Sequence, residues 1–323
     1  MRRLLLIDAN NLFIRNYIVN TALDFKDRPV GGVLGFLRSL GELSNLSQAD
    51  EVICVWDGEN GSGYRRSIYK GYKDGRKPIV PNTVKQYGLT PDQVEFSRQY
   101  QNLLVRKYLN FTPVKQLEIK GCEADDVIAF LTNHFVESSN MMLVSTDRDY
   151  YQLLRPGVIL YRPGSKAELL DASGVIAESN IHPTNYALYK CLLGDHSDNI
   201  KGIYGLGEKT IPKIFPMLCD SERVTLDVLK QHCFESVDKN RHYKNCLDNF
   251  LVIETNYKIC QLYEPPLTMS QISAILYNLE EFDSTFQYKG LLEECKEDSF
   301  KHHINLFGLW DELKRLASSV ISE

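Results

Sequence analysis

Three short apolar runs, each followed by an acidic residue, constrain the fold of this 323-residue chain more than any other feature. The runs are RLLLI before Asp8, VICVW before Asp57 and MMLVST before Asp147. Runs of this length are typical of strands that are buried on both faces of a parallel sheet. Because parallel strands present their carboxyl ends at one edge, we expect the three aspartates to lie together at that edge.

Helical patterns alternate with these strands through about residue 165, which indicates an α/β fold with a mainly parallel sheet flanked by helices. We expect the DANN segment after Asp8 to be a polar turn. Strands become scarce after about residue 183, so the second half is expected to be a helical layer packed on the sheet. This pattern predicts a core over 1–182 and a helical region over 183–323. Further expected elements are helices over 31–43, 93–110, 123–135, 272–279 and 306–316, and strands over 114–119 and 157–163.

Nine carboxylates fall in five clusters at expected strand ends or helix starts. They are Asp8, Asp57, Glu123, Asp125, Asp126, Asp147, Asp149, Asp195 and Asp198. So many like charges in one place destabilise a fold unless cations neutralise them. Hard oxygen ligands favour Mg²⁺ or Mn²⁺, and paired ions of this kind assist displacement of an oxygen at phosphorus. Helix capping or a turn would explain any single cluster. The occurrence of five such clusters in one chain indicates a two-metal site.

Two other segments are typical of nucleic-acid contact. Residues 58–90 interleave glycines and tyrosines with seven arginines and lysines, a combination that suits contact with a single nucleic-acid strand better than an ordinary solvated face. GIYGLGEKT over 202–210 is similar to a helix-hairpin-helix turn, in which backbone N–H groups grip a phosphate and Lys209 adds charge. A glycine-rich helix cap is the structural alternative. The segment lacks the spacing of a Walker A loop, so triphosphate hydrolysis is not indicated.

Net charge, cysteine content and the length of apolar stretches indicate the compartment and the partners that the chain can have. The formal net charge of −5 is mildly unfavourable for a nucleic-acid binder, although the nine clustered carboxylates account for the negative excess. Eight cysteines without a C-x-x-C pair indicate buried thiols in a reducing compartment. No apolar stretch approaches the ~18 residues that span a membrane. We therefore expect a cytoplasmic protein without membrane contact, and we expect His302 and His303 to be surface residues.

Taken together, these motifs closely resemble the flap endonuclease family of 5′ nucleases, in particular bacteriophage 5′-exonucleases and the 5′ nuclease domain of bacterial DNA polymerase I. LLLIDANNLFIRNY is similar to the family's opening strand, with Asp8 and Arg15 at the matching positions. YRRSIYKGYKDGRKP is similar to the family's arch segment, although Lys77 stands where proline is usual. GCEADD, STDRD, GDHSDN and GIYGLGEKT follow in the family's order. The resemblance covers residues 1 to about 215.

The resemblance implies a PIN-like fold with a helical arch over 58–90, a helix-hairpin-helix motif near 198–215 and two divalent ions, Mg²⁺ or Mn²⁺. By motif position Asp8, Asp57, Glu123 and Asp125 would hold the first ion. Asp147, Asp149, Asp195 and Asp198 would hold the second, with Asp126 supporting the pair. Lys73 and Arg76 would steady the scissile phosphate, and the hairpin would bind duplex DNA and a K⁺ ion. The residues expected to contact DNA are Arg15, Tyr64, Arg65, Tyr72, Lys73, Arg76, Gly202, Gly205, Gly207 and Lys209.

The implied activity is metal-dependent hydrolysis of phosphodiesters at 5′ ends or 5′ flaps, in DNA replication or repair. Asp8 and Asp147 would be catalytic together with Lys73 and Arg76. A nuclease that removes RNA primers, a DNA-binding module without catalysis and a phosphatase for small phosphoesters are the alternatives. We expect a monomer in the cytoplasm, or in the host cytoplasm if the protein is phage-encoded. DNA or an RNA–DNA hybrid would be its partner, and the unassigned residues 220–323 would contact a replication protein.

Overall fold

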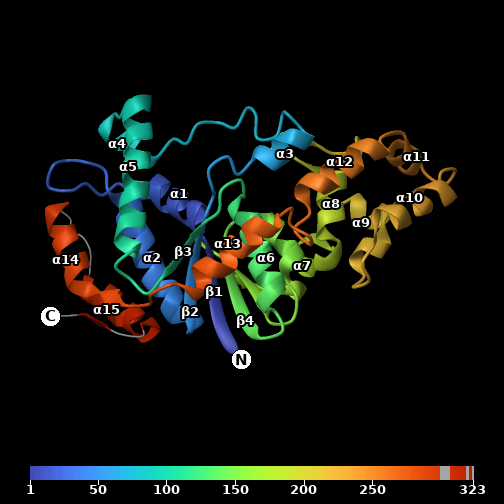
Figure 1. The fold of residues 1–323 in the computed structure, drawn as a ribbon. Helices are drawn as coiled ribbons and strands as arrows, with labels where there is room; N and C mark the ends of the chain where they lie inside the picture. The colour runs from blue at the N-terminus through green and yellow to red at the C-terminus, as the bar shows by residue number, and fades with distance from the viewer. Residues whose placement is uncertain (299–305, 318–319, 322–323) are drawn as a thin grey trace.

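A six-stranded sheet forms the centre of the molecule in the computed structural model, which describes residues 1–298, 306–317 and 320–321 (Figure 1). The strand order is β3-β2-β1-β4-β5-β6, and every neighbouring pair is parallel except β5 with β6. The strands are β1 (Arg2–Asp8), β2 (Glu51–Trp56), β3 (Lys115–Glu118), β4 (Ser139–Val144), β5 (Val158–Arg162) and β6 (Glu168–Leu170). The predicted mainly parallel sheet flanked by helices is confirmed.

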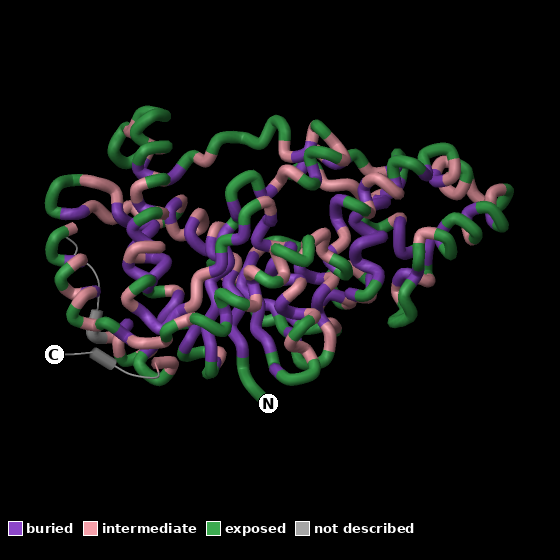
Figure 2. The backbone as a smooth tube through the Cα atoms, in the orientation of Figure 1, coloured by how far each residue is buried: buried purple, intermediate pink, exposed green. Residues whose placement is uncertain are grey.

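Both faces of the sheet are buried, as the continuous apolar runs predict. Successive residues of β1 point to opposite faces, so that Leu4 and Leu6 join one hydrophobic core and Leu5 and Ile7 join the other. Burial is concentrated in this central region (Figure 2). Complete burial of one such side chain contributes about 1.5–3 kcal/mol, so the two cores fix the positions of the strand ends.

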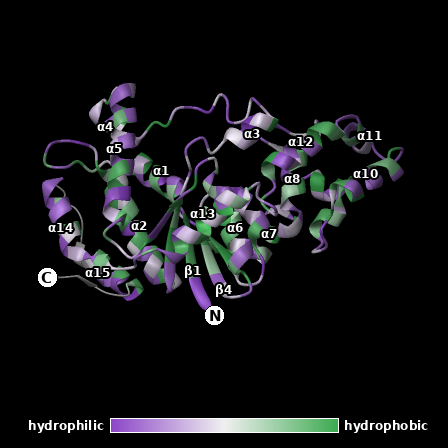
Figure 3. Cartoon of the chain, in the orientation of Figure 1, coloured by the Kyte–Doolittle hydropathy of each residue, from purple (hydrophilic) through white to green (hydrophobic). Residues whose placement is uncertain are grey.

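Helices α1 (Ala9–Val19), α2 (Gly31–Ser47) and α5 (Pro91–Leu109) cover one face of the sheet, and α6 (Ala124–Phe135) covers the other. Their apolar stripes face the strands, and hydrophobic residues are frequent in these helices (Figure 3). The prediction of a polar turn after Asp8 is wrong. The Asp8 carboxylate accepts a hydrogen bond from the Asn11 backbone N–H at 3.0 Å and caps α1. The polar residues Asp8, Asn10 and Asn11 therefore begin a helix.

The arch, residues 58–90, leaves the carboxyl end of β2 and returns to the start of α5. It contains α3 (Gly63–Ile68) and α4 (Asn82–Tyr87), joined by residues 69–81 without a strand or an α-helix. Figure 1 shows this segment crossing above the sheet from α3 to α4. The predicted basic, partly helical excursion therefore lies above one edge of the sheet.

The second half of the chain is mainly helical. Helix α12 packs on α8, and α10 and α11 lie beyond them, away from the sheet (Figure 1). The chain then returns, so that α13 lies beside β3 and α15 packs on α2. The division at residue 182 stays a prediction. The helices are α7 (Ala172–Ser179), α8 (Tyr186–Leu193), α9 (Ile211–Ile214), α10 (Leu226–Glu235), α11 (Arg241–Asp248), α12 (Phe250–Cys260), α13 (Met269–Glu280), α14 (Tyr288–Glu297) and α15 (Leu306–Leu313).

The cysteines and the apolar segments of the chain bear on its expected setting. All eight cysteines are free, and all are buried except Cys219, which is partly exposed. Within the described part of the chain, no helix combines the length and the apolar character that a membrane span needs. His302 and His303 lie outside the described residues.

Candidate active site

The carboxyl ends of β2, β1 and β4 bring three of the predicted aspartates to one edge of the sheet. Asp8 ends β1, Asp57 follows β2, and Asp147 follows β4. The Asp8 carboxylate accepts hydrogen bonds from Ser145 Oγ at 3.1 Å and from Tyr150 Oη at 3.3 Å, which tie β1 to the segment after β4. The pKa of the Tyr150 phenol is raised by burial and by the charges of Asp8, Asp125, Asp147 and Asp57. Of these four carboxylates, Asp8 is the one that accepts the Tyr150 hydrogen bond.

Asp57 positions the next acidic cluster. Its carboxylate accepts hydrogen bonds from Asn10 Nδ2 at 2.7 Å and from the backbone N–H of Ala124 at 2.8 Å. Ala124 is the first residue of α6, so this bond fixes the start of the helix against the end of β2. Glu123, Asp125 and Asp126 are held at the same edge as a result.

Arg65, from α3 of the arch, is buried among these three carboxylates. Its guanidinium makes a bidentate pair with Asp126 at 2.7 and 2.8 Å. It also lies 2.8 Å from Glu123 and 3.3 Å from Asp125, and its Nε donates to the Ile259 carbonyl at 3.0 Å. We expected Arg65 to contact DNA, but the structure places it in the interior because three carboxylates and a carbonyl compensate its charge.

Lys190, from α8, holds the second group of carboxylates. Its ammonium lies 2.6 Å from Asp149 and 2.5 Å from Asp195. Burial lowers the pKa of Lys190, but Asp149 and Asp195 outweigh it, so the pKa is raised. Burial raises the pKa of Asp147, and the charges of Asp8 and Asp198 add to this, against the Asp149 backbone hydrogen bond and the Lys190 charge. A cavity of about 530 Å³ opens beside these groups.

The arch lies directly over the acidic edge. Lys73 pairs with Glu123, and Arg76 pairs with Asp198. The Tyr72 hydroxyl also donates to Glu123, at 3.0 Å, and its ring is buried. Lys73 and Arg76 of the arch thus lie beside two of the predicted metal ligands, and their contact with the scissile phosphate stays a prediction. Tyr72, expected at a DNA contact, lies in the interior against Glu123.

Burial dominates the electrostatics of the site. It raises the pKa of Asp8 to about 6 and that of Asp149 to about 7, and it raises the pKa of Asp125 well above the ordinary value. Asp195 is the exception. Burial would raise its pKa, but the hydrogen bonds from Lys190 and Ser197 and the Lys190 charge lower it to about 2.

The carboxylates as arranged do not surround a common point. Among residues 1–298, 306–317 and 320–321, no three Asp, Glu, His or Cys side chains are grouped so that they could hold a metal ion. Arg65, Lys73, Arg76 and Lys190 instead draw the acidic groups toward themselves. The donor set still suits a hard divalent cation, because the nine carboxylates outnumber these four cations and several are buried.

The remaining residues predicted to contact DNA lie on two surfaces. Tyr64 is exposed on α3, and Arg15 lies on α1, partly exposed. In the hairpin Gly205 has a φ of +84°, and Lys209 is exposed. Gly202 is packed against the Leu193 carbonyl and leaves no space for a side chain, whereas Gly207 is open. The glycine-rich turn therefore exists, but the following helix α9 has only four residues.

Sequence reasoning missed several residues that organise the site. Asn10 orients Asp57, and Asn11 accepts hydrogen bonds from the Thr146 backbone and hydroxyl, both at 3.1 Å. Lys190 was missed because it lies within an apolar helix pattern, and Tyr150 because the aspartates before it drew the attention in its segment. The two asparagines directly after Asp8 were the available signal, since side-chain amides beside a strand end often orient neighbouring groups.

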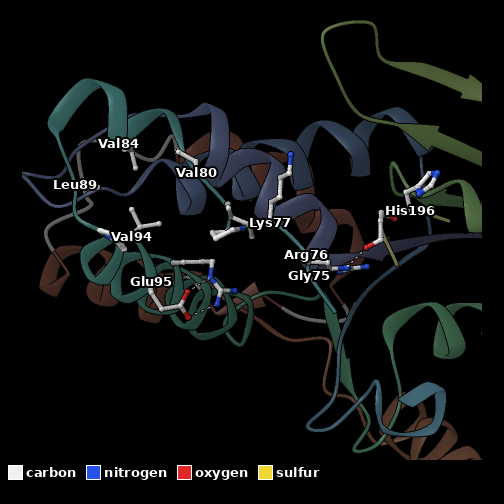
Figure 4. A pocket seen from close by; sticks show the side chains of 14 residues that line it. Gly75, Arg76, Lys77, Val80, Val84, Leu89, Val94, Glu95 and His196 are labelled. Atoms are coloured by element: carbon white, nitrogen blue, oxygen red, sulfur yellow. Dashed lines mark hydrogen bonds and ion pairs between the residues drawn. The ribbon is translucent and has the colours of Figure 1, made fainter. Parts of the chain in front are cut away.

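A second, larger cavity of about 1010 Å³ lies between the arch and α5, and His196 and Ser197 of the loop that carries Asp195 and Asp198 line its other end (Figure 4). Val80, Val84 and Val94 form part of an apolar wall. Arg76 and Lys77 stand toward the acidic edge, and Arg98 is paired with Glu95 at 2.6 Å. The cavity thus combines apolar walls with several cations.

Comparisons with known proteins agree with this arrangement. The family model described as the 5′-3′ exonuclease N-terminal resolvase-like domain matches residues 3–180. A 5′-3′ exonuclease of Aquifex aeolicus is 27% identical over 266 residues, which are 81% of this chain and 82% of the relative. Thermostable DNA polymerase I of Thermus aquaticus is 33% identical over 215 residues, 66% of this chain but only 23% of the polymerase. The chain thus spans about a quarter of that relative.

Solved structures show the same fold. The bacteriophage T5 flap endonuclease, in a complex with DNA and metal ions, superposes with a TM-score of 0.64 at 17% identity, covering 93% of this chain and 98% of that one. Flap endonuclease-1 of Methanococcus jannaschii superposes with a TM-score of 0.53 at 14% identity, covering 96% and 92% of the two chains.

Proposed function

The chain belongs to the 5′-3′ exonuclease family, and from this premise we propose that it is a structure-specific 5′ nuclease. It would hydrolyse phosphodiester bonds of DNA at 5′ ends and 5′ flaps during replication or repair. One observation carries the proposal. Asp8, Asp57 and Asp147 follow three neighbouring parallel strands at one edge of the sheet, and Lys73 and Arg76 of the arch pair with Glu123 and Asp198 of the same acidic clusters.

Two divalent ions, Mg²⁺ or Mn²⁺, are part of the proposal. Asp8, Asp57, Glu123 and Asp125 would hold one, and Asp147, Asp149, Asp195 and Asp198 the other. Bound there, such ions lower the pKa of a water molecule and offset charge on the phosphate. Asp126 is assigned a supporting role, since its carboxylate is occupied by a bidentate pair with Arg65.

The chain's own residues would orient the substrate. Lys73 and Arg76 can move from Glu123 and Asp198 to a phosphate, where they would offset the negative charge of the transition state. Ser145 and Tyr150 hold the Asp8 carboxylate in place meanwhile. A single strand would pass through the cavity beneath the arch, because apolar walls accept bases and cations accept phosphates.

The hairpin over 202–210 would hold the duplex part of the substrate. Its open Gly207 and exposed Lys209 suit a close approach to a phosphate, and a K⁺ ion would bind at the same turn.

We assign catalysis to 1–182 and duplex binding to 183–323. RNA–DNA hybrids are included among the substrates. The protein would act as a cytoplasmic monomer, and residues 220–323 would contact a replication protein.

The test compares 5′-flap cleavage in Mg²⁺ by the wild-type protein and by Asp147→Ala. We expect the variant to lose at least about a hundredfold in kcat, the usual scale for removal of a group that stabilises a transition state. Asp220→Asn, which neutralises an exposed aspartate outside the acidic edge, is the matched control and should cleave normally. Equal rates for Asp147→Ala and the wild type would refute the site. Cleavage of RNA alone would favour the RNA-directed alternative.

A further inference from the structure

The arch is held to the loop that carries Asp195 and Asp198 by three hydrogen bonds that use no carboxylate side chain. The Lys73 backbone N–H donates to the Asp198 carbonyl at 3.0 Å. Asn199 Nδ2 donates to the Gly71 carbonyl at 2.9 Å, and Arg76 Nε donates to the Ser197 carbonyl at 3.2 Å. We call these three bonds the latch. They join segments more than 120 residues apart in the sequence.

Both sides of the latch adopt a left-handed backbone. Lys73 has a φ of +61° and Asn199 a φ of +59°. Asparagine tolerates this region, but for lysine it is unfavourable and persists where the surrounding structure holds the residue in place. The Lys73 N–H is bonded to Asp198 while its ammonium lies on Glu123, so the strained residue is fixed at both ends.

Gly71 permits the close approach of the two segments. A Cβ at this position would lie 2.8 Å from Tyr69 Oη and 3.1 Å from Asn199 Nδ2. Any side chain at position 71 would therefore push against the amide group that donates the latch bond. The Asn199 amide supplies the hydrogen-bond donor, and Gly71 supplies the acceptor carbonyl and the space for the amide.

The latch differs from the ion pairs beside it. Lys73 and Arg76 pair with Glu123 and Asp198, which are also the groups proposed to hold divalent ions. Those ion pairs must open when the carboxylates take another cation or the lysine and arginine take a phosphate. The Arg76 Nε bond of the latch opens with them, because it belongs to the same guanidinium. The Asn199 amide bond and the Lys73 backbone bond compete with neither event, so these two bonds can keep the arch in place while the charged side chains move.

We infer that Asn199 is a positioning residue whose side-chain amide holds the arch backbone at Gly71 and thereby keeps Lys73 and Arg76 above the acidic edge. Asn199 contacts no reacting group itself. The inference rests on the proposed nuclease function for its effect on cleavage. The structural half, that Asn199 restrains the arch, stands independently of that function.

Hydrogen exchange of the arch amides tests the structural half. Asn199→Gly removes the amide and keeps a residue that accepts the left-handed backbone. We expect the Lys73 amide to exchange roughly two- to tenfold faster, the factor that corresponds to loss of one hydrogen bond. Asn180→Gly is the matched control, since Asn180 is also left-handed (φ +55°) and bonds through its amide to Cys219, away from the arch. Its arch exchange should equal that of the wild type.

Gly71→Ala disturbs the same contact from the arch side, because the added Cβ would press on the Asn199 amide. This variant replaces Asn199→Gly in the experiment if Asn199→Gly folds poorly. It should also speed arch exchange, and the double variant should be no faster than the faster single variant, because both remove one bond. Additive effects, or acceleration spread equally over the sheet amides, would overturn the inference, as would unchanged arch exchange in both single variants.

Flap cleavage tests the functional half. In Asn199→Gly we expect kcat to fall roughly tenfold or more because Lys73 and Arg76 are misplaced, while KM changes less than about twofold. An unchanged kcat together with faster arch exchange would show that the latch does not position these residues. If the wild-type protein cleaves no flap, the proposed function fails, and the exchange experiment still decides whether Asn199 restrains the arch.

Discussion

Arg65 illustrates how one buried cation organises the acidic edge. It belongs to the arch, yet its guanidinium bonds to Asp126 in α6 and to the Ile259 carbonyl in α12. Glu123 and Asp125 lie within 3.3 Å of it. Buried charges of this kind contribute little net stability as a pair, but loss of one partner leaves the other uncompensated. Arg65 thus joins the arch, the sheet edge and the second half of the chain.

Replacement of Arg65 by alanine should therefore be strongly destabilising. Without divalent ions, we expect Arg65→Ala to lower the free energy of unfolding by about 3–5 kcal/mol, because Glu123 and Asp126 lose their buried counter-charge. Denaturant unfolding measures the difference. Arg66→Ala, beside it but exposed and paired only with exposed Asp74, should change stability by less than about 0.5 kcal/mol. Similar losses for both variants would show that Arg65 is an ordinary surface arginine.

Asp24 provides a test of pH dependence outside the acidic edge. Burial raises the pKa of its carboxyl, but hydrogen bonds from Arg28 and from the Lys26 and Arg28 backbone outweigh burial and lower it. The unfolded carboxyl, with a pKa of about 3.9, takes up a proton first as the pH falls. The contribution of Asp24 is therefore complete above about pH 4 and is lost as the pH falls through the lower, folded pKa.

Asp24→Asn should accordingly cost about 1–3 kcal/mol of unfolding free energy at pH 7, where hydrogen bonds to a charged group are lost. The difference from the wild type should shrink below pH 4. Unfolding curves at pH 7 and pH 3 measure it. A difference that is the same at both pH values would mean that the carboxylate charge is not the stabilising feature.

Among the elements, the hairpin over 202–210 contains a glycine with a left-handed backbone. Gly205 has a φ of +84°, and a Cβ there would lie 3.0 Å from the His242 ring of α11. Asn245 of the same helix donates to the Tyr204 carbonyl at 2.7 Å. Helix α11 therefore packs against the hairpin at Tyr204 and Gly205.

Gly205→Ala should destabilise the protein by about 1–2 kcal/mol, the cost of a left-handed alanine, and should weaken duplex binding. Gly207→Ala is the paired variant, since position 207 has open space around it. It should leave stability unchanged and weaken binding only if a phosphate approaches the backbone there. Denaturant unfolding and fluorescence anisotropy with duplex DNA separate the two effects. Equal stability of both variants would contradict the assigned strain.

The elements that the sequence predicted best are those with a strong apolar period. The strands of the parallel sheet, and α2, α5 and α6, follow from buried runs and amphipathic stripes. Helix α1 was missed because DANN reads as a turn, although Asp8 caps a helix there. Helices α7, α10, α11 and α14 were not predicted, because their short patterns are set by tertiary packing.

The same limit applies to the site. The nine carboxylates could be found because they follow strands or open helices. The roles of Arg65, Lys190 and Asn199 could not, since each depends on contacts between segments that only the fold brings together. The burial of Arg65 and Tyr72 could not be predicted either. Their motif suggested DNA contact, which stays a prediction, and the structure places both side chains in the interior.

For the whole molecule, the decisive property is an excess of negative charge at one edge of the sheet. Four cationic side chains face nine carboxylates there, so a divalent cation should bind the folded protein in preference to the unfolded chain. At a concentration one hundred times its dissociation constant, one such ion adds about 2.7 kcal/mol to the free energy of unfolding.

Thermal unfolding tests this expectation. Tm should rise when Mg²⁺ or Mn²⁺ replaces Na⁺ at equal ionic strength, and the rise should be smaller in Asp8→Asn. Asp220→Asn controls for the loss of one surface charge. An equal rise in all three proteins would mean that the ions act elsewhere than at the acidic edge.

The positions at which divalent ions bind decide whether this edge of the sheet is the catalytic site. Anomalous diffraction from a crystal soaked in Mn²⁺ locates them without any assay of activity. We predict two peaks roughly 3.5–4 Å apart, the spacing of two-metal sites, with Asp8 and Glu123 beside one and Asp149 and Asp195 beside the other. Peaks confined to other surfaces, or none at these carboxylates, would contradict the assignment of this edge as the catalytic site.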